Sequence, residues 1–212
     1  MDARRGSEIT MICGTNNTGK TAIARQLVIK YNKKRDILEK KNKYPSNYNK
    51  LIVYDPQHAF QDLMREGDVN LDMADKEWEE KVLRYRASLV VLDDYKELMP
   101  NDRLSDGFLK LMSARARFGL DFNMITWSPK LIMPRLEIFI NKYILLKVNS
   151  DDKEFADRIA GDKPTVIGIK NSLNREFMRY TDEEYKKLYP NFPFVFWDGA
   201  RNKAMKVNFK NK

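Results

Sequence analysis

Short, mostly apolar runs recur along the sequence and alternate with polar stretches that carry apolar residues at helical spacing. Runs of strand length lie at 9–13, 51–54, 89–92, 120–126 and 143–148. The run at 89–92 is apolar at every position, which is typical of a central parallel strand covered on both faces. Strands that alternate with helices predict an α/β domain with a mainly parallel central sheet flanked by helices.

Two segments between these runs have the apolar spacing of amphipathic helices. The apolar positions are Ile23, Leu27, Val28 and Tyr31 in the first segment, and Leu104, Phe108 and Leu111 in the second. Gly119 is expected to end the second helix, because glycine readily adopts the left-handed conformation at a helix C-terminus. The charged stretch at 65–81 predicts a loop that leads into another helix.

The last third of the sequence predicts smaller elements. Asp151 and Glu154 have the spacing of a capping box, which predicts a short helix that ends at Gly161. The segments 165–169 and 175–180 predict a small antiparallel strand pair. Beyond them the sequence is aromatic and interrupted by prolines, and such aromatic side chains usually fill cores.

One loop fits the phosphate-binding pattern GxxxxGK[ST] at every fixed position. It comprises Gly14, Thr15, Asn16, Asn17, Thr18, Gly19, Lys20 and Thr21. Backbone N–H groups must surround a triphosphate, and only small or αL-tolerant residues let a loop curl that tightly. Lys20 is predicted to reach the β- and γ-phosphates, and the Thr21 hydroxyl to ligate the bridging Mg²⁺. The motif requires a preceding strand and a following helix, and both are predicted, so we expect ATP and Mg²⁺ as ligands.

Two acids, Asp93 and Asp94, directly follow the run at 89–92. In motor ATPases a carboxylate at the end of a buried strand beside the phosphate-binding loop holds Mg²⁺ through water. We therefore assign Asp93 to the metal and Asp94 to the orientation and deprotonation of the attacking water. A role as turn formers and helix caps is the alternative for this acid pair. Thr126, at the next strand end, is the candidate sensor of the γ-phosphate, with Ser128 second.

Length and composition predict one substantial domain. The chain has 212 residues, enough for a sizeable core. Its single cysteine, Cys13, lies in the first predicted strand, so we expect a buried, inert thiol and a reducing compartment. We expect a core over residues 1–161 and a C-terminal β-rich aromatic extension with a basic tail over 162–212, packed on the same domain. No apolar run has the length of a membrane span and no signal peptide is visible, so a cytoplasmic location is predicted.

The net charge is +9 and the excess is clustered. Residues 30–43 contain seven basic residues and two acids, and residues 201–212 contain five basic residues and no acid. Clustered positive charge is typical of proteins that bind polyanions, most often nucleic acid. A solvated helix face and a basic tail without a partner are the alternative.

The order of these features resembles that of the FtsK–HerA superfamily of P-loop motors. The features are the phosphate-binding loop, the strand end Tyr54-Asp55-Pro56, the acid pair Asp93-Asp94, an arginine pair before Gly119, and a polar strand end followed by Pro129. The small size resembles most the genome-packaging ATPases of membrane-containing double-stranded DNA viruses. The resemblance implies a RecA-like fold of the additional-strand type and covers roughly residues 9–161.

The resemblance also implies partners and further site residues. Members form homo-oligomeric rings that thread double-stranded DNA, and capsid or vertex proteins are further expected partners, in the host cytoplasm or in the virion. A neighbour's arginine completes each site, which makes Arg115 or Arg117 the candidate finger in trans. The sequence departs from the family where Asp94 stands in place of the usual glutamate, and where Thr126-Trp127-Ser128 stands in place of the common glutamine sensor. Slow intrinsic hydrolysis is one consequence that these departures allow.

Three other functions remain open from the sequence. A P-loop small-molecule kinase, with a nucleotide-type substrate, has the same loop and a similar size, but requires an acceptor pocket and an arginine-rich lid. A phage assembly or export ATPase has the same core. A nucleotide-gated adaptor that barely hydrolyses ATP fits the departures at Asp94 and Trp127.

Overall fold

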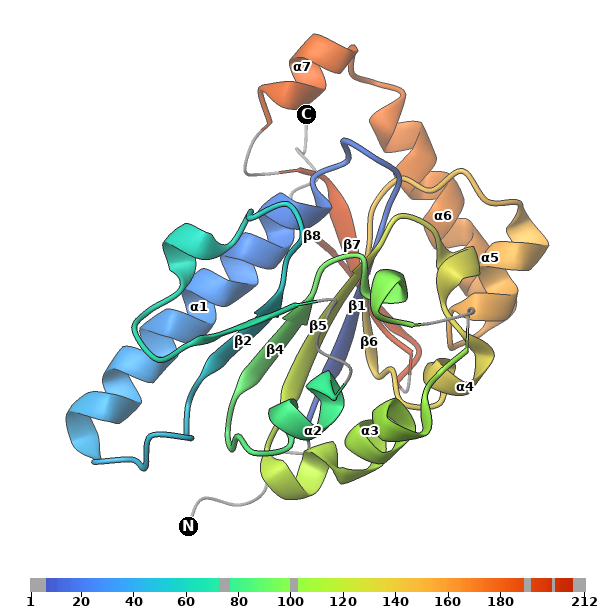
Figure 1. Cartoon of the computed structure of the whole chain (residues 1–212). Coiled ribbons are helices and arrows are strands. Elements are labelled where there is room, and N and C mark those ends of the chain that lie inside the picture. The colour runs from blue at the N-terminus through green and yellow to red at the C-terminus, as the bar shows by residue number, and fades with distance from the viewer. Residues whose placement is uncertain (1–6, 73–76, 100–102, 189–191, 200, 208–212) are drawn as a thin grey trace. The chain divides into compact units, whose positions relative to one another are not determined.

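The computed structural model describes residues 7–72, 77–99, 103–188, 192–199 and 201–207 and shows an α/β fold (Figure 1). The strands are β1 (Ile9–Cys13), β2 (Leu51–Tyr54), β3 (Val69–Leu71), β4 (Leu89–Leu92), β5 (Asp121–Thr126), β6 (Lys142–Leu145), β7 (Phe194–Asp198) and β8 (Lys203–Val207). The helices are α1 (Lys20–Lys41), α2 (Trp78–Val82), α3 (Asp106–Phe118), α4 (Pro134–Glu137), α5 (Asp152–Arg158), α6 (Lys163–Phe177) and α7 (Asp182–Lys186). Within these ranges, no helix is long and apolar enough to cross a membrane.

The strands are hydrogen-bonded in the order β3-β2-β4-β5-β1-β6-β7-β8. The pairs β2–β3, β2–β4, β4–β5 and β1–β6 are parallel, whereas β6–β7 and β7–β8 are antiparallel. Strands β2 and β4 are buried at every residue, as a parallel strand covered on both faces requires. The five strands predicted from apolar runs are confirmed, and the short strand β3 was missed because it has only three residues.

The chain divides into two compact units. The first contains Met1–Ile9 and Arg25–Met124, with β2, β3, β4, α2 and α3; the second contains Thr10–Ala24 and Ile125–Lys212, with β6 to β8 and α4 to α7. Strands β1 and β5 and helix α1 contribute residues to both units. In the first unit α2 packs against α3, and in the second α5 packs against α6.

The predicted helix ends near residues 119 and 151 are confirmed. Helix α3 ends at Gly119, whose φ of 67° is left-handed and allows its N–H to bond back to the helix. Asp151 caps helix α5, which begins at Asp152: its Oδ1 accepts the N–H of Glu154 at 2.8 Å. This helix ends at Arg158, before the predicted stop at Gly161.

The antiparallel strand pair predicted at 165–169 and 175–180 is wrong, because this segment forms the helix α6. Asp162 caps the helix by accepting the N–H of Thr165 at 3.0 Å, and a proline occupies the first turn. The buried residues Val166, Ile169 and Leu173 follow at helical spacing. Tertiary burial of this face overrides the strand preference of its β-branched residues.

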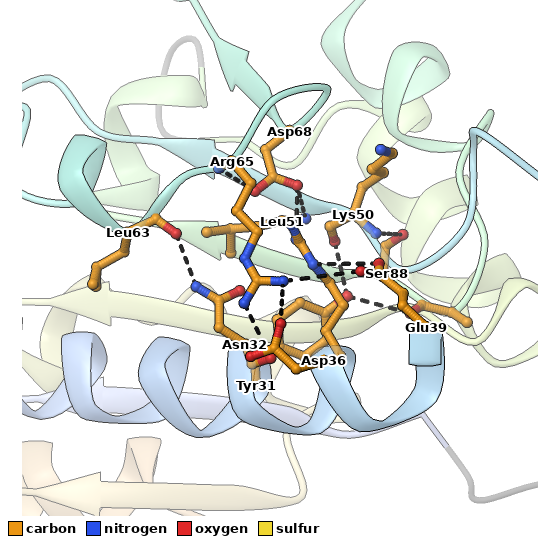
Figure 2. Close-up of polar contacts among 12 residues, drawn as sticks. Tyr31, Asn32, Asp36, Glu39, Lys50, Leu51, Leu63, Arg65, Asp68 and Ser88 are labelled. Atoms are coloured by element: carbon orange, nitrogen blue, oxygen red, sulfur yellow. Dashed lines mark hydrogen bonds and ion pairs between the residues drawn. The ribbon is translucent and has the colours of Figure 1, made fainter. Parts of the chain in front are cut away.

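A buried ion pair anchors α1 to the strands of the first unit. The Arg35 guanidinium and the Asp68 carboxylate lie 2.8 Å apart, and both side chains are almost fully buried. The same carboxylate accepts the backbone N–H groups of Leu51 at 3.0 Å and Arg65 at 2.8 Å. Figure 2 shows that Arg65 also reaches Asp36 on α1, at 2.7 Å. Arg35, counted above in the basic run, is therefore a structural residue rather than part of an open basic surface.

We predict that Asp68→Ala lowers the free energy of unfolding by about 3–5 kcal/mol, because it leaves the Arg35 charge buried without its partner. Asp36→Ala removes an exposed ion pair and is the matched control, with an expected loss below about 1 kcal/mol. Chemical denaturation of both variants measures the difference. Equal losses in the two variants would contradict the prediction.

Candidate nucleotide-binding site

The phosphate-binding loop lies between β1 and α1 in the second unit, as predicted. Its first residues are held by carbonyl groups from neighbouring strand ends. Gly14 donates its N–H to the carbonyl of Thr126 at 3.3 Å, and Thr15 donates its N–H to the carbonyl of Lys147 at 2.8 Å. Helix α1 begins at Lys20, so the N–H groups of its first turn face away from the helix and toward the loop.

The small and αL-tolerant residues of the loop adopt the conformations that the motif predicts. Asn17 has a φ of 61° and Gly19 a φ of 97°, in the region that favours glycine and tolerates asparagine. A Cβ atom on Gly19 would collide with the Phe192 ring. On Gly14 it would lie 2.6 Å from the Thr18 hydroxyl oxygen. Both glycines are therefore required by close packing.

The polar side chains of the loop make contacts within it. The Lys20 ammonium donates to the carbonyl of Thr15 at 3.0 Å, and the Thr18 hydroxyl donates to the same carbonyl at 2.7 Å. These two bonds close the loop on itself. Asn16 and Asn17 are exposed, and Thr21 is half-buried in the first turn of α1. Two residues of the motif, Lys20 and Thr21, thus belong to the first turn of α1.

Cys13 directly precedes the loop and is a free, buried thiol, as predicted. Burial raises the pKa of this thiol far above its ordinary value, while the charge of Lys20 lowers it by a smaller amount. The thiol is therefore neutral at physiological pH and unreactive as a nucleophile.

Asp93 and Asp94 end β4 in the first unit. Asp93 is buried, and its N–H donates to the carbonyl of Tyr54 at 2.9 Å. Asp94 is half-buried and left-handed, with a φ of 48°, and begins a 3₁₀ helix (Tyr95–Leu98). The side chain of Asp94 makes no capping bond to this helix, which weakens the alternative of a simple helix cap.

Sequence reasoning assigned no role to the carboxylate of Asp55, which ends the neighbouring strand β2. Residue pairing of Tyr54 with Leu92 places Asp55 and Asp93 at adjacent strand ends. Asp55 is buried, and its Oδ2 accepts the N–H of Phe60 at 2.7 Å. Its Oδ1 is also buried and has no hydrogen-bond partner within the described residues. The motif Tyr54-Asp55-Pro56 was the signal in the sequence that could have identified it.

Thr126, the predicted sensor, ends β5 and contacts the loop through its backbone. Its side chain is buried, and its hydroxyl donates to the carbonyl of Ser128 at 3.2 Å. The Ser128 hydroxyl in turn accepts the N–H of Lys130 at 3.3 Å. The Thr126 hydroxyl can still accept a hydrogen bond, but to donate one to a phosphate it must leave the Ser128 carbonyl.

The two candidate finger arginines differ in their surroundings, although both lie on α3 in the first unit. Arg115 is half-buried and donates to the carbonyl of Met112 in its own helix. Burial lowers the pKa of Arg115. Arg117 is exposed, with its guanidinium 5.9 Å from the centre of the Phe118 ring. Arg117 is thus the more accessible of the two.

Contacts to the loop from the C-terminal part of the chain were not expected from the sequence. The Tyr185 hydroxyl donates to the carbonyl of Thr18 at 2.9 Å, and the Phe192 ring covers Gly19. The aromatic residues of this segment are expected to pack in the core, and Tyr185 and Phe192 do pack, but against the phosphate-binding loop. Nothing in the local sequence identifies that partner.

No protein-family model and no curated protein matches the sequence. Solved structures do match. The DNA-packaging ATPase B204 of Sulfolobus turreted icosahedral virus is 11% identical, with a TM-score of 0.62, and the alignment covers 94% of this chain and 96% of that one.

Two further solved structures show the same fold. The genome-packaging NTPase B204 of Sulfolobus turreted icosahedral virus 2, in complex with ATP-gammaS, is 12% identical, with a TM-score of 0.60 over 94% of this chain and 96% of that one. EccC of Thermomonospora curvata, with its ATPases 2 and 3, is 12% identical, with a TM-score of 0.59 over 95% of this chain and 36% of that one. The fold is therefore that of the P-loop ATPases, as expected, and the solved structures that share it include viral packaging ATPases and EccC.

We predict that Gly19→Ala destabilises the protein by about 1–3 kcal/mol, because it combines a left-handed backbone with a clash against Phe192. Gly168→Ala is the matched control, since Gly168 lies in α6 with open space around its Cα atom. That control is expected to gain about 0.5–1 kcal/mol of stability, as glycine costs that much relative to alanine inside a helix. Thermal unfolding measures both, and equal effects of the two variants would refute the assignment.

Proposed function

We propose that this protein is an ATP-hydrolysing DNA translocase that works as a viral genome-packaging motor and pushes double-stranded DNA into a capsid. The observation that carries the proposal is the phosphate-binding loop at Gly14–Thr21. It has the backbone geometry that its motif requires, in a chain that aligns over nearly its whole length with packaging ATPases. The packaging ATPase of the second virus was solved with ATP-gammaS bound.

The loop is proposed to bind the ATP phosphates with its N–H groups and with Lys20. The left-handed residues Asn17 and Gly19 let successive N–H groups converge, which creates a concave site for an anion. The Lys20 ammonium already lies across the loop, bonded to the Thr15 carbonyl. On nucleotide binding, phosphate oxygens would replace that carbonyl as the acceptor of the ammonium.

Thr21 and Asp93 are proposed to hold Mg²⁺, Thr21 through its hydroxyl and Asp93 through water. The buried Oδ1 of Asp55, which has no hydrogen-bond partner among the described residues and lies at the strand end next to the buried Asp93, supports this. A buried carboxylate oxygen without a donor is unfavourable unless a cation or water reaches it, so these strand ends suit a divalent ion. When bound, Mg²⁺ neutralises charge that develops on the phosphates.

Asp94 is proposed to accept the proton of the attacking water, and Thr126 to respond to the γ-phosphate. Asp94 follows Asp93 directly, and β4 pairs in parallel with β5, which ends at Thr126. The carboxyl ends of parallel strands lie at the same edge of a sheet, where α/β proteins place their ligand sites. The Thr126 backbone carbonyl already contacts Gly14, which would link the sensor to the loop.

Exposed lysines on α1 and just after it are proposed to contact the DNA backbone without reading its sequence. The residues are Lys30, Lys33, Lys34, Lys40, Lys41 and Lys43. The two acids of this segment interact with arginines: Asp36 with Arg65, and Glu39 with Arg35 at 3.6 Å. The lysines therefore keep most of the local charge, and their binding to phosphates would weaken steeply with salt.

The assembly is proposed to be a homo-oligomeric ring, recruited by capsid or vertex proteins in the host cytoplasm or the virion. Residues 162–212 are proposed to form an extension that packs on the core of residues 1–161. Contacts of Tyr185 and Phe192 with the loop support such packing.

A phage assembly or export ATPase is the second candidate, because the protein also has the fold of EccC. The EccC structure contains a signal sequence peptide and belongs to a type VII secretion ATPase. This chain spans 36% of that EccC chain. Stimulation of hydrolysis by a peptide instead of DNA would favour this candidate.

We predict that the purified protein hydrolyses ATP at low salt and that double-stranded DNA raises the rate, because the exposed lysines bring DNA to the motor. The measurement is steady-state phosphate release with and without DNA. Lys20→Ala is the blank and should lose nearly all activity. Added salt should abolish the stimulation, because salt weakens contacts between lysines and phosphates. In a plot of log DNA affinity against log salt concentration, each neutralised phosphate makes the slope more negative by about 0.9.

Two lysine variants of equal charge separate a DNA-binding surface from general electrostatics. Lys33→Gln with Lys34→Gln should lose the stimulation by DNA and keep the basal rate. Lys110→Gln with Lys153→Gln removes two exposed lysines elsewhere and should keep both. Hydrolysis that requires a small phosphate acceptor, with no effect of DNA, would instead establish a kinase.

We predict that Arg117→Ala lowers the ATPase rate of the assembled protein by at least about tenfold, since a finger arginine stabilises transition-state charge. Arg115→Ala is the matched control on the same helix. It should lower the rate little, because Arg115 bonds to its own helix. Light scattering checks that both variants assemble. If neither variant lowers turnover while assembly persists, the finger lies elsewhere.

A further inference from the structure

An aromatic cluster in the second unit packs directly against the phosphate-binding loop. Four residues form this cluster, which we call the aromatic brace: Phe177, Tyr180, Tyr185 and Phe192. Tyr185 lies at its centre, with ring centres 4.6 Å from Phe177, 5.1 Å from Phe192 and 6.1 Å from Tyr180. Tyr185 and Phe192 are buried and pack with Ala22 in the first turn of α1.

The brace contacts the loop through one buried hydrogen bond. The Tyr185 hydroxyl donates to the carbonyl of Thr18 at 2.9 Å, across 167 positions of sequence. Thr18 is 1% exposed, so water does not compete for this carbonyl. Burial raises the pKa of the Tyr185 phenol, which keeps it protonated and able to donate.

This bond fixes the orientation of the peptide group between Thr18 and Gly19. In a trans peptide the carbonyl of Thr18 and the N–H of Gly19 point in opposite directions. Tyr185 holds the carbonyl on the side of the brace, so the N–H of Gly19 is directed to the opposite side. The left-handed φ of 97° at Gly19 is consistent with a peptide that must be held in one orientation.

Two further contacts connect the brace to the loop. The Phe192 ring lies where a side chain on Gly19 would be. Lys147 accepts the N–H of Thr15 with its carbonyl at 2.8 Å, and its ammonium lies 3.8 Å above the Phe177 ring. The loop is therefore held at Thr15, Thr18 and Gly19 by groups that also contact one another.

We propose that Tyr185 is a positioning residue for nucleotide binding, which orients the Thr18–Gly19 peptide so that the Gly19 N–H is ready to bind a phosphate. This inference rests on the proposed function, because it assigns the loop to a nucleotide. Pre-organisation of one donor removes the cost of turning the peptide when the ligand arrives. The binding energy of the phosphate is then not spent on ordering the loop.

The test compares Tyr185→Phe with Tyr180→Phe in the full chain. Both changes remove one phenol oxygen from the brace, but the Tyr180 hydroxyl is 3.4 Å from Glu176 and not bonded to the loop. We expect Tyr185→Phe to weaken binding of ATP with Mg²⁺ about three- to tenfold, the equivalent of one neutral hydrogen bond. Tyr180→Phe should bind like the unaltered protein. Titration calorimetry measures the affinities.

Two more readouts separate positioning from a general loss of structure. In Tyr185→Phe the KM for ATP should rise while kcat stays the same, because a donor that is no longer pre-organised weakens binding and leaves the chemical step as it was. Hydrogen exchange of the amides at 14–21 should be faster in Tyr185→Phe and unchanged in Tyr180→Phe. If ATP affinity and amide exchange are both unchanged in Tyr185→Phe, this inference is wrong, while the proposed function still stands. If the unaltered protein does not bind ATP, the proposed function itself fails.

Discussion

A phosphate-binding loop must leave most of its N–H groups for the ligand, so few of them can stabilise its own fold. Many of the groups that fix such a loop must therefore come from outside it. Here Thr126 and Lys147 supply carbonyls at its start, and Tyr185 holds the carbonyl of Thr18. The C-terminal aromatic segment therefore does more than fill a core, because it also holds the loop in place. The same constraint places the sensor candidate Thr126 in direct backbone contact with the loop.

The helix that leaves the loop is subject to a different constraint. Helix α1 begins with Lys20 of the phosphate-binding loop and has 22 residues, most of them polar. After Tyr31 the helix has few apolar residues, and one of them, Ile37, is exposed, so this half needs other anchors. The buried pair of Arg35 and Asp68 supplies one. A buried ion pair adds little net stability, but breaking it leaves a charge buried without a partner. A shift of α1 along the strands would separate Arg35 from Asp68 in this way. We therefore infer that the pair specifies the position of α1.

The sequence was most informative where chemistry forces local residue choices. The loop, the strand runs, the Gly119 stop and the Asp151 cap all follow from short-range rules of backbone geometry and burial, and the structure confirms them. It was misleading in α6, where β-branched residues favour a strand locally and the decisive burial is tertiary. The bond from Tyr185 to Thr18 and the pairing of Arg35 with Asp68 join residues far apart in sequence, so no local pattern indicates them.

The backbone at Asp94 explains the departure from the acid pair usual in the family that the sequence resembles. Asp94 has a φ of 48°, in the left-handed region. Aspartate is enriched there over longer side chains, because its short polar group can interact with the local backbone. The backbone thus favours aspartate where that family has glutamate. A shorter carboxylate reaches less far, so under the role proposed for Asp94 the attacking water would lie closer to the end of β4 than it would beside a glutamate.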